Sequence, residues 1–221
     1  MFVKTFMTQQ PITVSPDDNF PQAMSVIRKR KIRHLPVLDK DKLIGIVVES
    51  DLLSNQPSPA TTLSLYEIYS LLETLRIRQI MSRPVIAVEG DCPLEEAARI
   101  MVENKISCLP VMDGVKLVGI ITETDVFKVL VEVLGGKEDG IRLTLSLPDR
   151  AGVLANISRQ IADAGGNIVA VTTTSVEGGK RETMIKETGA DREKVESFLE
   201  KSEVEVIDLR TSSPYEPRLF G

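Results

Sequence analysis

The chain repeats itself once, at a constant offset of 74 residues and without an internal gap. The heptapeptide GIVVESD at 45–51 returns as GIITETD at 119–125. The agreement extends far beyond the heptapeptide, and the matched pairs include Met7 and Met81, Val14 and Val88, Asp17 and Asp91, Ala23 and Ala97, and Ile32 and Ile106. A duplicated sequence predicts two copies of one structural unit, which constrains the fold more than any other feature of the chain.

Each copy has the pattern of a small α/β unit. A short apolar strand precedes a helix with apolar residues at i, i+3, i+4 and i+7, and two hairpin-linked strands then lead to a second helix that begins at the heptapeptide aspartate. The expected strands are 12–14, 35–38 and 43–48 in copy one, and 85–88, 109–112 and 117–121 in copy two. One such unit of about 50 residues would leave a sheet face uncovered, and two packed together would bury it.

The connector between the copies contains a helix signal. Its first part, NQPSPATT at 55–62, has the composition of a turn region. Ser64 and Glu67 then form a capping-box pattern, and the apolar stripe that follows is Leu65, Ile68, Leu72 and Leu75. We therefore expect a packed helix in the connector.

The last third of the chain reads as a separate domain after the polar, glycine-rich joint GGKEDG. Alternating apolar residues predict a strand at 141–147, and the following patterns give the order β-α-β-β-α-β, a ferredoxin-like plan. The predicted organisation is repeat 1 at 1–54, a connecting segment with a helix at 55–76, repeat 2 at 77–134, a linker at 135–140, the ferredoxin-like domain at 141–210 and a tail at 211–221. The tail is expected to be an arm on a partner subunit or a disordered end.

Composition argues against several functional classes. Twenty-seven basic and thirty-two acidic residues leave a net charge of −5, so no overall field draws the protein to nucleic acid or to an anionic membrane. The chain lacks an apolar run of about 18 residues and opens without the apolar core of a signal peptide, so we expect a cytoplasmic protein. Cys92 and Cys108 are too few for a disulfide framework or a metal site, and we expect them to be small apolar side chains.

The residue sets of common enzyme sites are also missing from the sequence. It contains no P-loop, no metal-ligand cluster and no paired His/Cys nucleophile, and His34 is its only histidine. We therefore expect a protein without catalytic activity, metal or required cofactor.

Two family resemblances follow from these motifs. The LPV triplet, a hairpin and the pattern G-I-[IV]-T-E-x-D make residues 1 to about 132 resemble a tandem pair of CBS domains, a Bateman module. The motifs DRAGVL and GGNI make residues from about 140 to 210 resemble an ACT domain, and the whole layout is similar to CBS–ACT proteins of the acetoin-utilisation type. The implied fold class is α/β and α+β, with two pseudo-symmetric β-α-β-β-α units before a ferredoxin-like ACT domain.

The resemblance assigns ligand roles to the heptapeptide. Asp125 would accept hydrogen bonds from ribose hydroxyls, and Thr122 would donate one to a phosphate oxygen. The alternative is that Asp125 caps the following helix and Thr122 only satisfies the preference of a strand for β-branched residues. Copy one keeps Asp51 but has Val48 at the hydroxyl position, so we expect its site to hold ribose with a poorer grip on phosphate.

In CBS pairs the ligand clefts lie between the repeats, so residues from one copy would reach a ligand held by the other. Arg33 and His34 lie immediately before LPV and would contact base or phosphate, while the corresponding stretch of copy two brings no comparable positive charge. The candidate adenine contacts are Ile12, Ile32, Ile86 and Ile106. The alternatives are that the isoleucines belong to the core, that His34 is structural, and that the basic run at 28–31 is a solvated helix end.

The ACT resemblance implies a second ligand site, where paired domains bind an amino acid or a similar small molecule. The corresponding residues are Asp149, Gly152, Asn156, Asn167 and Ile168. The alternative is that Asp149 caps the helix and that Asn167 sits in a left-handed turn after two glycines.

Together the resemblances imply a regulatory ligand sensor. An adenine nucleotide such as AMP, ADP or ATP would bind between the CBS repeats, a small metabolite would bind at the ACT domain, and the activity of a partner protein would change as a result. We expect a two-fold symmetric homodimer that does not associate with nucleic acid or membranes. The alternative is an oligomerisation scaffold with vestigial ligand sites.

Overall fold

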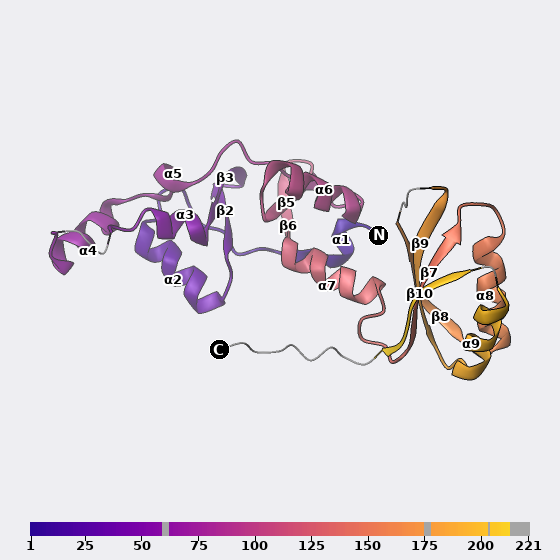
Figure 1. Cartoon of the computed structure of the whole chain (residues 1–221). Helices are drawn as coiled ribbons and strands as arrows, with labels where there is room; N and C mark the ends of the chain where they lie inside the picture. Colours follow the sequence, from indigo (N-terminus) through magenta and orange to yellow (C-terminus); the bar gives the residue numbers. More distant parts are fainter. Residues whose placement is uncertain (59–61, 175–177, 203, 213–221) are drawn as a thin grey trace. The chain divides into compact units, whose positions relative to one another are not determined.

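The computed structural model describes residues 1–58, 62–174, 178–202 and 204–212, and the chain divides into two compact units, Met1–Phe127 and Lys128–Gly221 (Figure 1). Each unit is described by itself. The predicted tail lies almost entirely outside the described residues, because only its first two residues are included, at the end of the last strand.

The first unit contains the duplicated elements that the sequence predicts. Repeat 1 contributes α2 (Phe20–Arg30), β2 (His34–Asp39), β3 (Lys42–Val48) and α3 (Glu49–Ser54). Repeat 2 contributes β4 (Val88–Glu89), α6 (Leu94–Asn104), β5 (Cys108–Asp113), β6 (Lys116–Thr122) and α7 (Glu123–Val133), which continues into the second unit. The two hairpins have the same register, since Pro36 pairs with Ile46 and Pro110 with Ile120, 74 residues further on.

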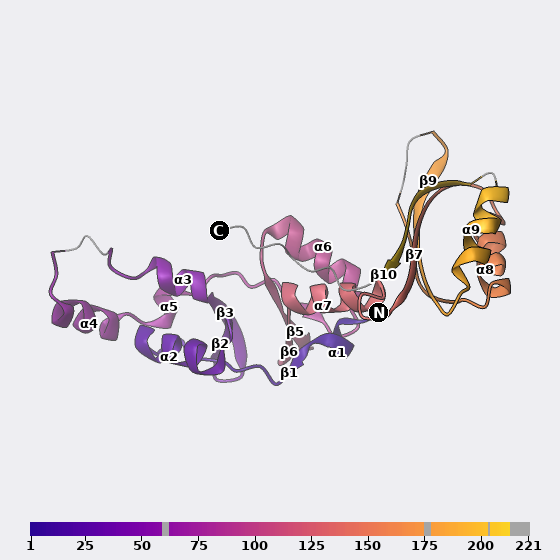
Figure 2. The same cartoon turned by 60° about the horizontal axis from the view of Figure 1, so that its bottom comes forward.

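The first segment of each repeat packs against the other repeat. The N-terminal α1 (Val3–Phe6) and β1 (Thr8–Gln9) join the sheet of repeat 2, which has the order β1-β6-β5-β4 (Figure 2). In the same way α5 (Ile77–Ile80) precedes Ser82, which bridges to Ile46 of β3. The predicted strands at 12–14 and 85–88 are wrong for most of their length, because Val14 forms only an isolated parallel bridge to Val37 and the equivalent strand of repeat 2, β4, begins at Val88.

A glycine and a methionine make each of these cross-repeat contacts close. A Cβ atom on Gly119 would overlap the sulfur of Met7, and a Cβ atom on Gly45 would overlap the sulfur of Met81. Both pairs are related by the 74-residue offset. In each repeat, the heptapeptide glycine therefore leaves the space that the methionine side chain of the other repeat occupies.

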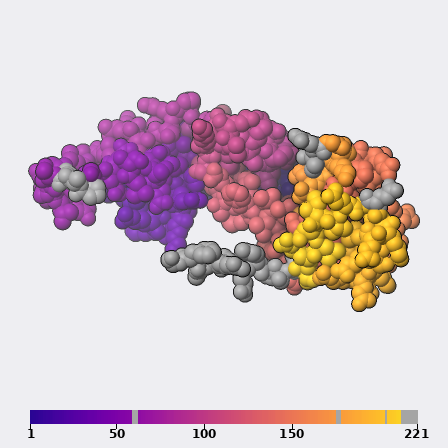
Figure 3. All heavy atoms as spheres, in the orientation of Figure 1, coloured from indigo at the N-terminus to yellow at the C-terminus, as the bar shows by residue number. Residues whose placement is uncertain are grey.

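The connector contains the predicted helix, α4 (Leu65–Thr74), which stands at the end of the first unit (Figure 3). Its capping box is confirmed, since the Ser64 N–H donates to Glu67 Oε2 at 2.8 Å and the Glu67 N–H donates to Ser64 Oγ at 3.4 Å. The expectation of a packed helix is wrong for most of its length. Leu72 packs against the core of repeat 1, but no residue of α4 is buried.

The second unit has the predicted β-α-β-β-α-β order. Its elements after α7 are β7 (Gly140–Pro148), α8 (Val153–Asp163), β8 (Asn167–Thr173), β9 (Lys180–Thr188), α9 (Arg192–Lys201) and β10 (Glu205–Ser212). The four strands form an antiparallel sheet of order β10-β7-β9-β8, and both helices cover one face of it (Figures 1 and 2). The alternating residues Ile141, Leu143, Leu145 and Leu147 are buried under these helices, as their pattern predicts.

Candidate functional site

The site begins where a central strand of each repeat turns into a helix. The helices α3 and α7 begin at Glu49 and Glu123, two residues before the predicted start at the aspartate. Asp51 Oδ2 accepts a hydrogen bond from the Val48 N–H at 3.1 Å, and Asp125 Oδ2 accepts one from the Thr122 N–H at the same distance. Each aspartate therefore caps its own helix by holding the backbone of the residue before it, which confirms the alternative interpretation for Asp125. The other half of that alternative is wrong, because the Thr122 hydroxyl takes part in the cap and accepts a hydrogen bond from the Asp125 N–H at 3.4 Å.

A pocket of about 330 Å³ opens beside Asp51, between the two repeats. Its lining from repeat 1 includes Val48, Ser50 and Asp51, and its lining from the second half of the unit includes Ile86, Lys105, Ile106, Ser107 and Cys108. This volume lies at the lower end of the range for small-molecule sites. We call this pocket the Asp51 cleft.

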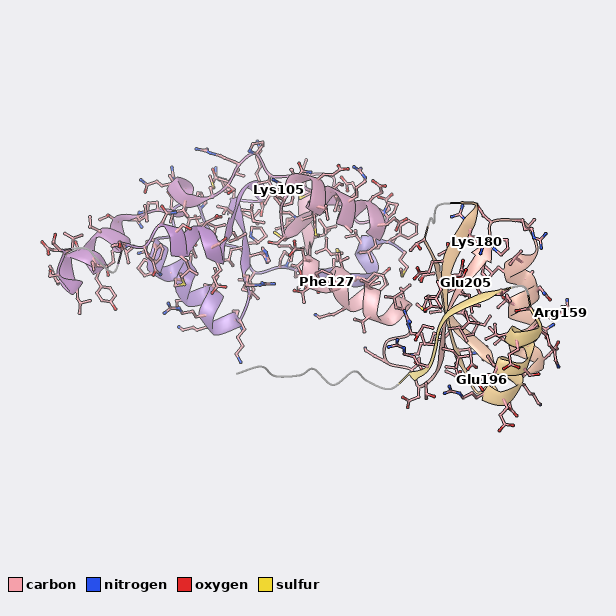
Figure 4. All side chains as sticks on the ribbon, in the orientation of Figure 1. Lys105, Phe127, Arg159, Lys180, Glu196 and Glu205 are labelled. Atoms are coloured by element: carbon pink, nitrogen blue, oxygen red, sulfur yellow. The ribbon has the colours of Figure 1, made fainter. Side chains whose placement is uncertain are left out.

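The Asp51 cleft combines three kinds of chemistry. Ile86 and Ile106 supply apolar surface, and Asp51 supplies a carboxylate with capacity for further hydrogen bonds beyond its helix cap. Lys105 supplies an ammonium group and lies between the ribbons of the two repeats (Figure 4). Such a set of groups can hold a flat apolar ring, hydroxyl groups and one anionic group.

The predicted residues divide between this cleft and the equivalent helix start of repeat 2. Asp51, Ile86 and Ile106 come together in the Asp51 cleft. On the other side Arg33 Nη2 donates to Thr124 Oγ1 at 3.2 Å, so a cation of repeat 1 reaches the helix start of repeat 2. The Thr122 hydroxyl donates to Asp125 Oδ2 at 2.7 Å, so here it supports the helix cap.

The other predicted nucleotide residues, His34, Ile12 and Ile32, do not line the Asp51 cleft. His34 Nε2 lies 2.7 Å from Ser107 Oγ, and burial lowers the pKa of His34, with the charge of Arg33 adding to this effect and Asp125 opposing it. Ile12 is exposed, whereas Ile32 packs against the core of repeat 1.

Lys105, Ser50 and Ser107 are cleft residues that the sequence reasoning missed. The expectation that copy two brings no comparable positive charge overlooks Lys105, because one lysine at the end of α6 reaches the cleft of Asp51. A usable signal existed in the repeat, since Lys105 is the 74-residue counterpart of Lys31 in the basic run.

The chemistry of Cys108 matches its expected role as a small apolar side chain. Burial raises the pKa of Cys108 to about 12, and the charge of Glu123 adds to the effect, so the thiol stays protonated at neutral pH. Among the described residues no group of three or more His, Cys, Asp or Glu side chains is placed to hold a metal ion. Within the same residues, we find no helix with the length and apolar character needed to cross a membrane.

The predicted ACT ligand residues do not form one site within a single chain. Pro148, next to Asp149, pairs with Lys180, whereas Asn167 pairs with Thr188 at the other end of β9, about 27 Å away for eight strand steps. Gly152 and Asn156 lie at the Asp149 end, and Ile168 lies at the Asn167 end.

The alternative roles given to the two polar residues of this domain are also wrong. Asp149 does not cap α8 but pairs with Arg181 Nε at 2.8 Å, which lowers the pKa of Asp149. Asn167 begins a strand, and the positive φ lies at Gly165.

The fold is a duplicated α/β module with a pocket between its repeats, followed by a ferredoxin-like domain. Residues 3–58 and 77–132 match the CBS domain family, and residues 139–210 match the family of TTHA0829-like ACT domains. The chain therefore belongs to the CBS-domain family, with two CBS domains followed by a TTHA0829-like ACT domain.

Relatives share mainly the CBS pair. The Methanocaldococcus jannaschii protein MJ1426 is 34% identical over 155 residues, which cover 59% of this chain and 92% of that protein. Inosine-5′-monophosphate dehydrogenase of the same organism is 33% identical over 119 residues, which cover 53% of this chain and only 21% of the dehydrogenase.

Solved structures also match a little under two thirds of this chain. A Vibrio cholerae protein named for acetoin utilization (AcuB) superposes with a TM-score of 0.52 at 32% sequence identity. The match covers 62% of this chain and 95% of the Vibrio cholerae chain. The CBS domain pair of protein MJ0100 superposes with a TM-score of 0.50 at 28% sequence identity, and the match covers 62% of this chain and 98% of the MJ0100 chain. That structure is a complex with 5′-methylthioadenosine and S-adenosyl-L-methionine.

Proposed function

We propose that the protein is a non-catalytic regulatory sensor that binds an adenine nucleoside or nucleotide in the Asp51 cleft. The observation that carries this proposal is the pocket itself, where a carboxylate from one repeat faces two isoleucines from the other. The complex of the MJ0100 CBS pair with two adenosine compounds supports the choice of ligand class.

The proposed contacts follow from the groups that line the cleft. One hydrogen bond from the Val48 N–H leaves most of the acceptor capacity of the Asp51 carboxylate for the vicinal hydroxyls of a ribose. Ile86 and Ile106 would pack on the faces of adenine, since they are apolar residues that the cleft leaves partly uncovered.

Binding would act on the arrangement of the two repeats. A ligand in the Asp51 cleft contacts both repeats at once, so it stabilises the arrangement in which these contacts fit best. At saturation, the ligand changes the equilibrium constant between the two arrangements by the ratio of its affinities for them. A partner protein that binds only one arrangement would then respond to the ligand.

A titration of the intact chain tests the proposal. We expect adenosine, AMP, ADP, ATP or S-adenosylmethionine to give a saturable signal in calorimetry, and Asp51→Asn to weaken it at least about tenfold through loss of hydrogen bonds to a charged acceptor. Asp39→Asn, at the exposed end of a hairpin, is the matched control and should bind like the parent.

Two further outcomes separate the alternatives. If Asp125→Asn abolishes binding and Asp51→Asn does not, the ligand lies at the equivalent position beside Asp125, and Arg33 and His34 make this position the second candidate. If no adenine compound binds the parent chain, the scaffold alternative is favoured, in keeping with the capping roles of both aspartates.

Other functional expectations remain proposals. An amino acid or similar metabolite at the ACT domain would need residues from two chains, because the two halves of the predicted site lie at opposite ends of one sheet. Cell fractionation would test the proposed cytoplasmic location. Growth of a deletion strain on acetoin would test a link to acetoin utilisation. Affinity capture with and without nucleotide would identify the regulated partner.

A further inference from the structure

The connector helix α4 buries no residue, although its side chains outside the polar stripe of Glu67, Ser70 and Thr74 are mostly large and apolar. Leu65, Tyr66 and Tyr69 are 76%, 83% and 65% exposed, and Leu71 is also exposed. Exposed apolar side chains gathered on one surface mark a site of interaction with another protein. Among the described residues, Leu72 and the following Leu75 pack against the core of repeat 1, and Ile68 lines the groove that α4 shares with α2.

A groove of about 510 Å³ runs between α2 and α4 and has one basic end. Apolar residues of both helices line it, including Phe20, Met24 and Leu65, and Arg28 and Lys29 add positive charge. Neither cation forms an ion pair with any residue that the structure describes. The groove therefore fits a mainly apolar helix that carries a negative charge near one end.

The two helices run in opposite directions. The Phe20 N–H at the start of α2 donates to the Leu75 carbonyl just after α4, at 2.9 Å, and Arg28 at the end of α2 shares the groove with Leu65 at the start of α4. Glu73, which is exposed, lies at the opposite end of α4 from this basic end.

We propose that this groove is a self-association surface in which α4 of a second copy lies antiparallel to α4 of the first. A two-fold axis across the helices places the partner's Glu73 beside Arg28 and Lys29, and by symmetry the same ion pairs form twice. The exposed leucine and tyrosine side chains of both copies are then buried against one another. The second copy is favoured as the occupant because the chain itself carries both the apolar helix and the matching acid.

Light scattering behind size exclusion tests the surface. We expect the parent chain to be a dimer at micromolar concentration and the double variant Leu65→Glu/Tyr69→Glu to be a monomer with an unchanged circular dichroism spectrum, because both side chains are exposed in the single chain. Val115→Glu is the matched control, since it places the same charge at a residue that is 89% exposed in the hairpin turn of repeat 2, and it should remain dimeric.

A charge exchange tests the pairing itself. Arg28→Glu should weaken the dimer at least about tenfold, and addition of Glu73→Arg in the same chain should restore it, because each new acid then faces a new base. A monomeric parent chain, a dimer that survives the double variant, or a charge exchange without recovery would each overturn the proposal. None of these measurements requires a bound nucleotide, so the result is independent of the proposed sensor function.

Discussion

Asp51 and Asp125 each hold the backbone N–H of the residue three positions earlier, so the group expected to bind ribose also begins a helix. At Asp51 the two roles are compatible, because a carboxylate has about four acceptor positions and the Val48 N–H uses one of them. Replacement by alanine would remove both roles and cost about 1 kcal/mol in lost capping alone. Asparagine keeps an acceptor for the cap and is therefore the informative substitution.

Lys105 should determine how strongly the Asp51 cleft holds a phosphate group. Among the described residues it is the one cation that lines the cleft, and it adopts a left-handed conformation with φ of 54° that favours glycine. We expect Lys105→Met to weaken AMP about tenfold and to leave adenosine unchanged in calorimetry, because only the phosphate contact is lost. Lys31→Met, the pseudo-symmetric control, should leave AMP binding in this cleft unchanged, and an equal loss for adenosine and AMP would contradict the assignment.

The stability of the chain should depend on the protonation of His34. Burial lowers the pKa of His34 from its ordinary value of 6.5, so the unfolded chain takes up the proton first as the pH falls. The free energy of unfolding should therefore decline below about pH 6.5 and level off once the pH is below the folded pKa. Urea unfolding of the parent and of His34→Gln, which keeps a hydrogen bond to Ser107, measures this, and parallel pH profiles would contradict it.

At the level of secondary-structure elements, the repeats are joined by exchanged segments. The N-terminal segment completes the sheet of repeat 2, and the segment after the connector contacts repeat 1. A linear comparison of the two copies cannot reveal this exchange, because the same 74-residue offset would also arise if each segment packed on its own repeat. The choice depends on which packing buries Met7 and Met81 best.

Gly119→Ala should loosen the N-terminal segment from repeat 2. The new Cβ atom overlaps the Met7 sulfur, and overpacking of this kind costs about 1–3 kcal/mol. Denaturant unfolding of Gly119→Ala, Met7→Ala and the double variant forms a thermodynamic cycle, in which the alanine at 119 should cost less once Met7 is shortened. Additive costs would show that the contact does not limit the packing.

At the scale of the whole molecule, each unit has its own core. The core of repeat 1 and the core beneath α8 and α9 share no residue. We therefore expect two transitions in calorimetric unfolding. Adenosine at 100 times its dissociation constant should stabilise the first unit by about 2.7 kcal/mol and leave the second transition in place. A single transition that moves as a whole would show that the units unfold together.

Most of the fold was predictable because its signals are local or repeated. The hairpins, the capping box at Ser64 and the alternation in β7 depend on residues close in the chain, the duplication repeats such signals, and the structure confirms them. The two halves of the predicted ACT site illustrate the opposite case. Their motifs lie near each other in sequence, but α8 carries the chain back along the sheet, so Asp149 and Asn167 are separated by the length of a strand.

Periodicity and duplication alone were enough to establish two equivalent units and a ferredoxin-like domain, because secondary structure follows from residue spacing along the chain. The partners across the repeats required the folded molecule. Lys105 shares a cleft with Asp51, Arg33 donates to Thr124, and His34 lies beside Ser107 only because the two repeats pack against each other. Long-range contacts depend on which surfaces are buried together, and no local pattern in the sequence records that choice.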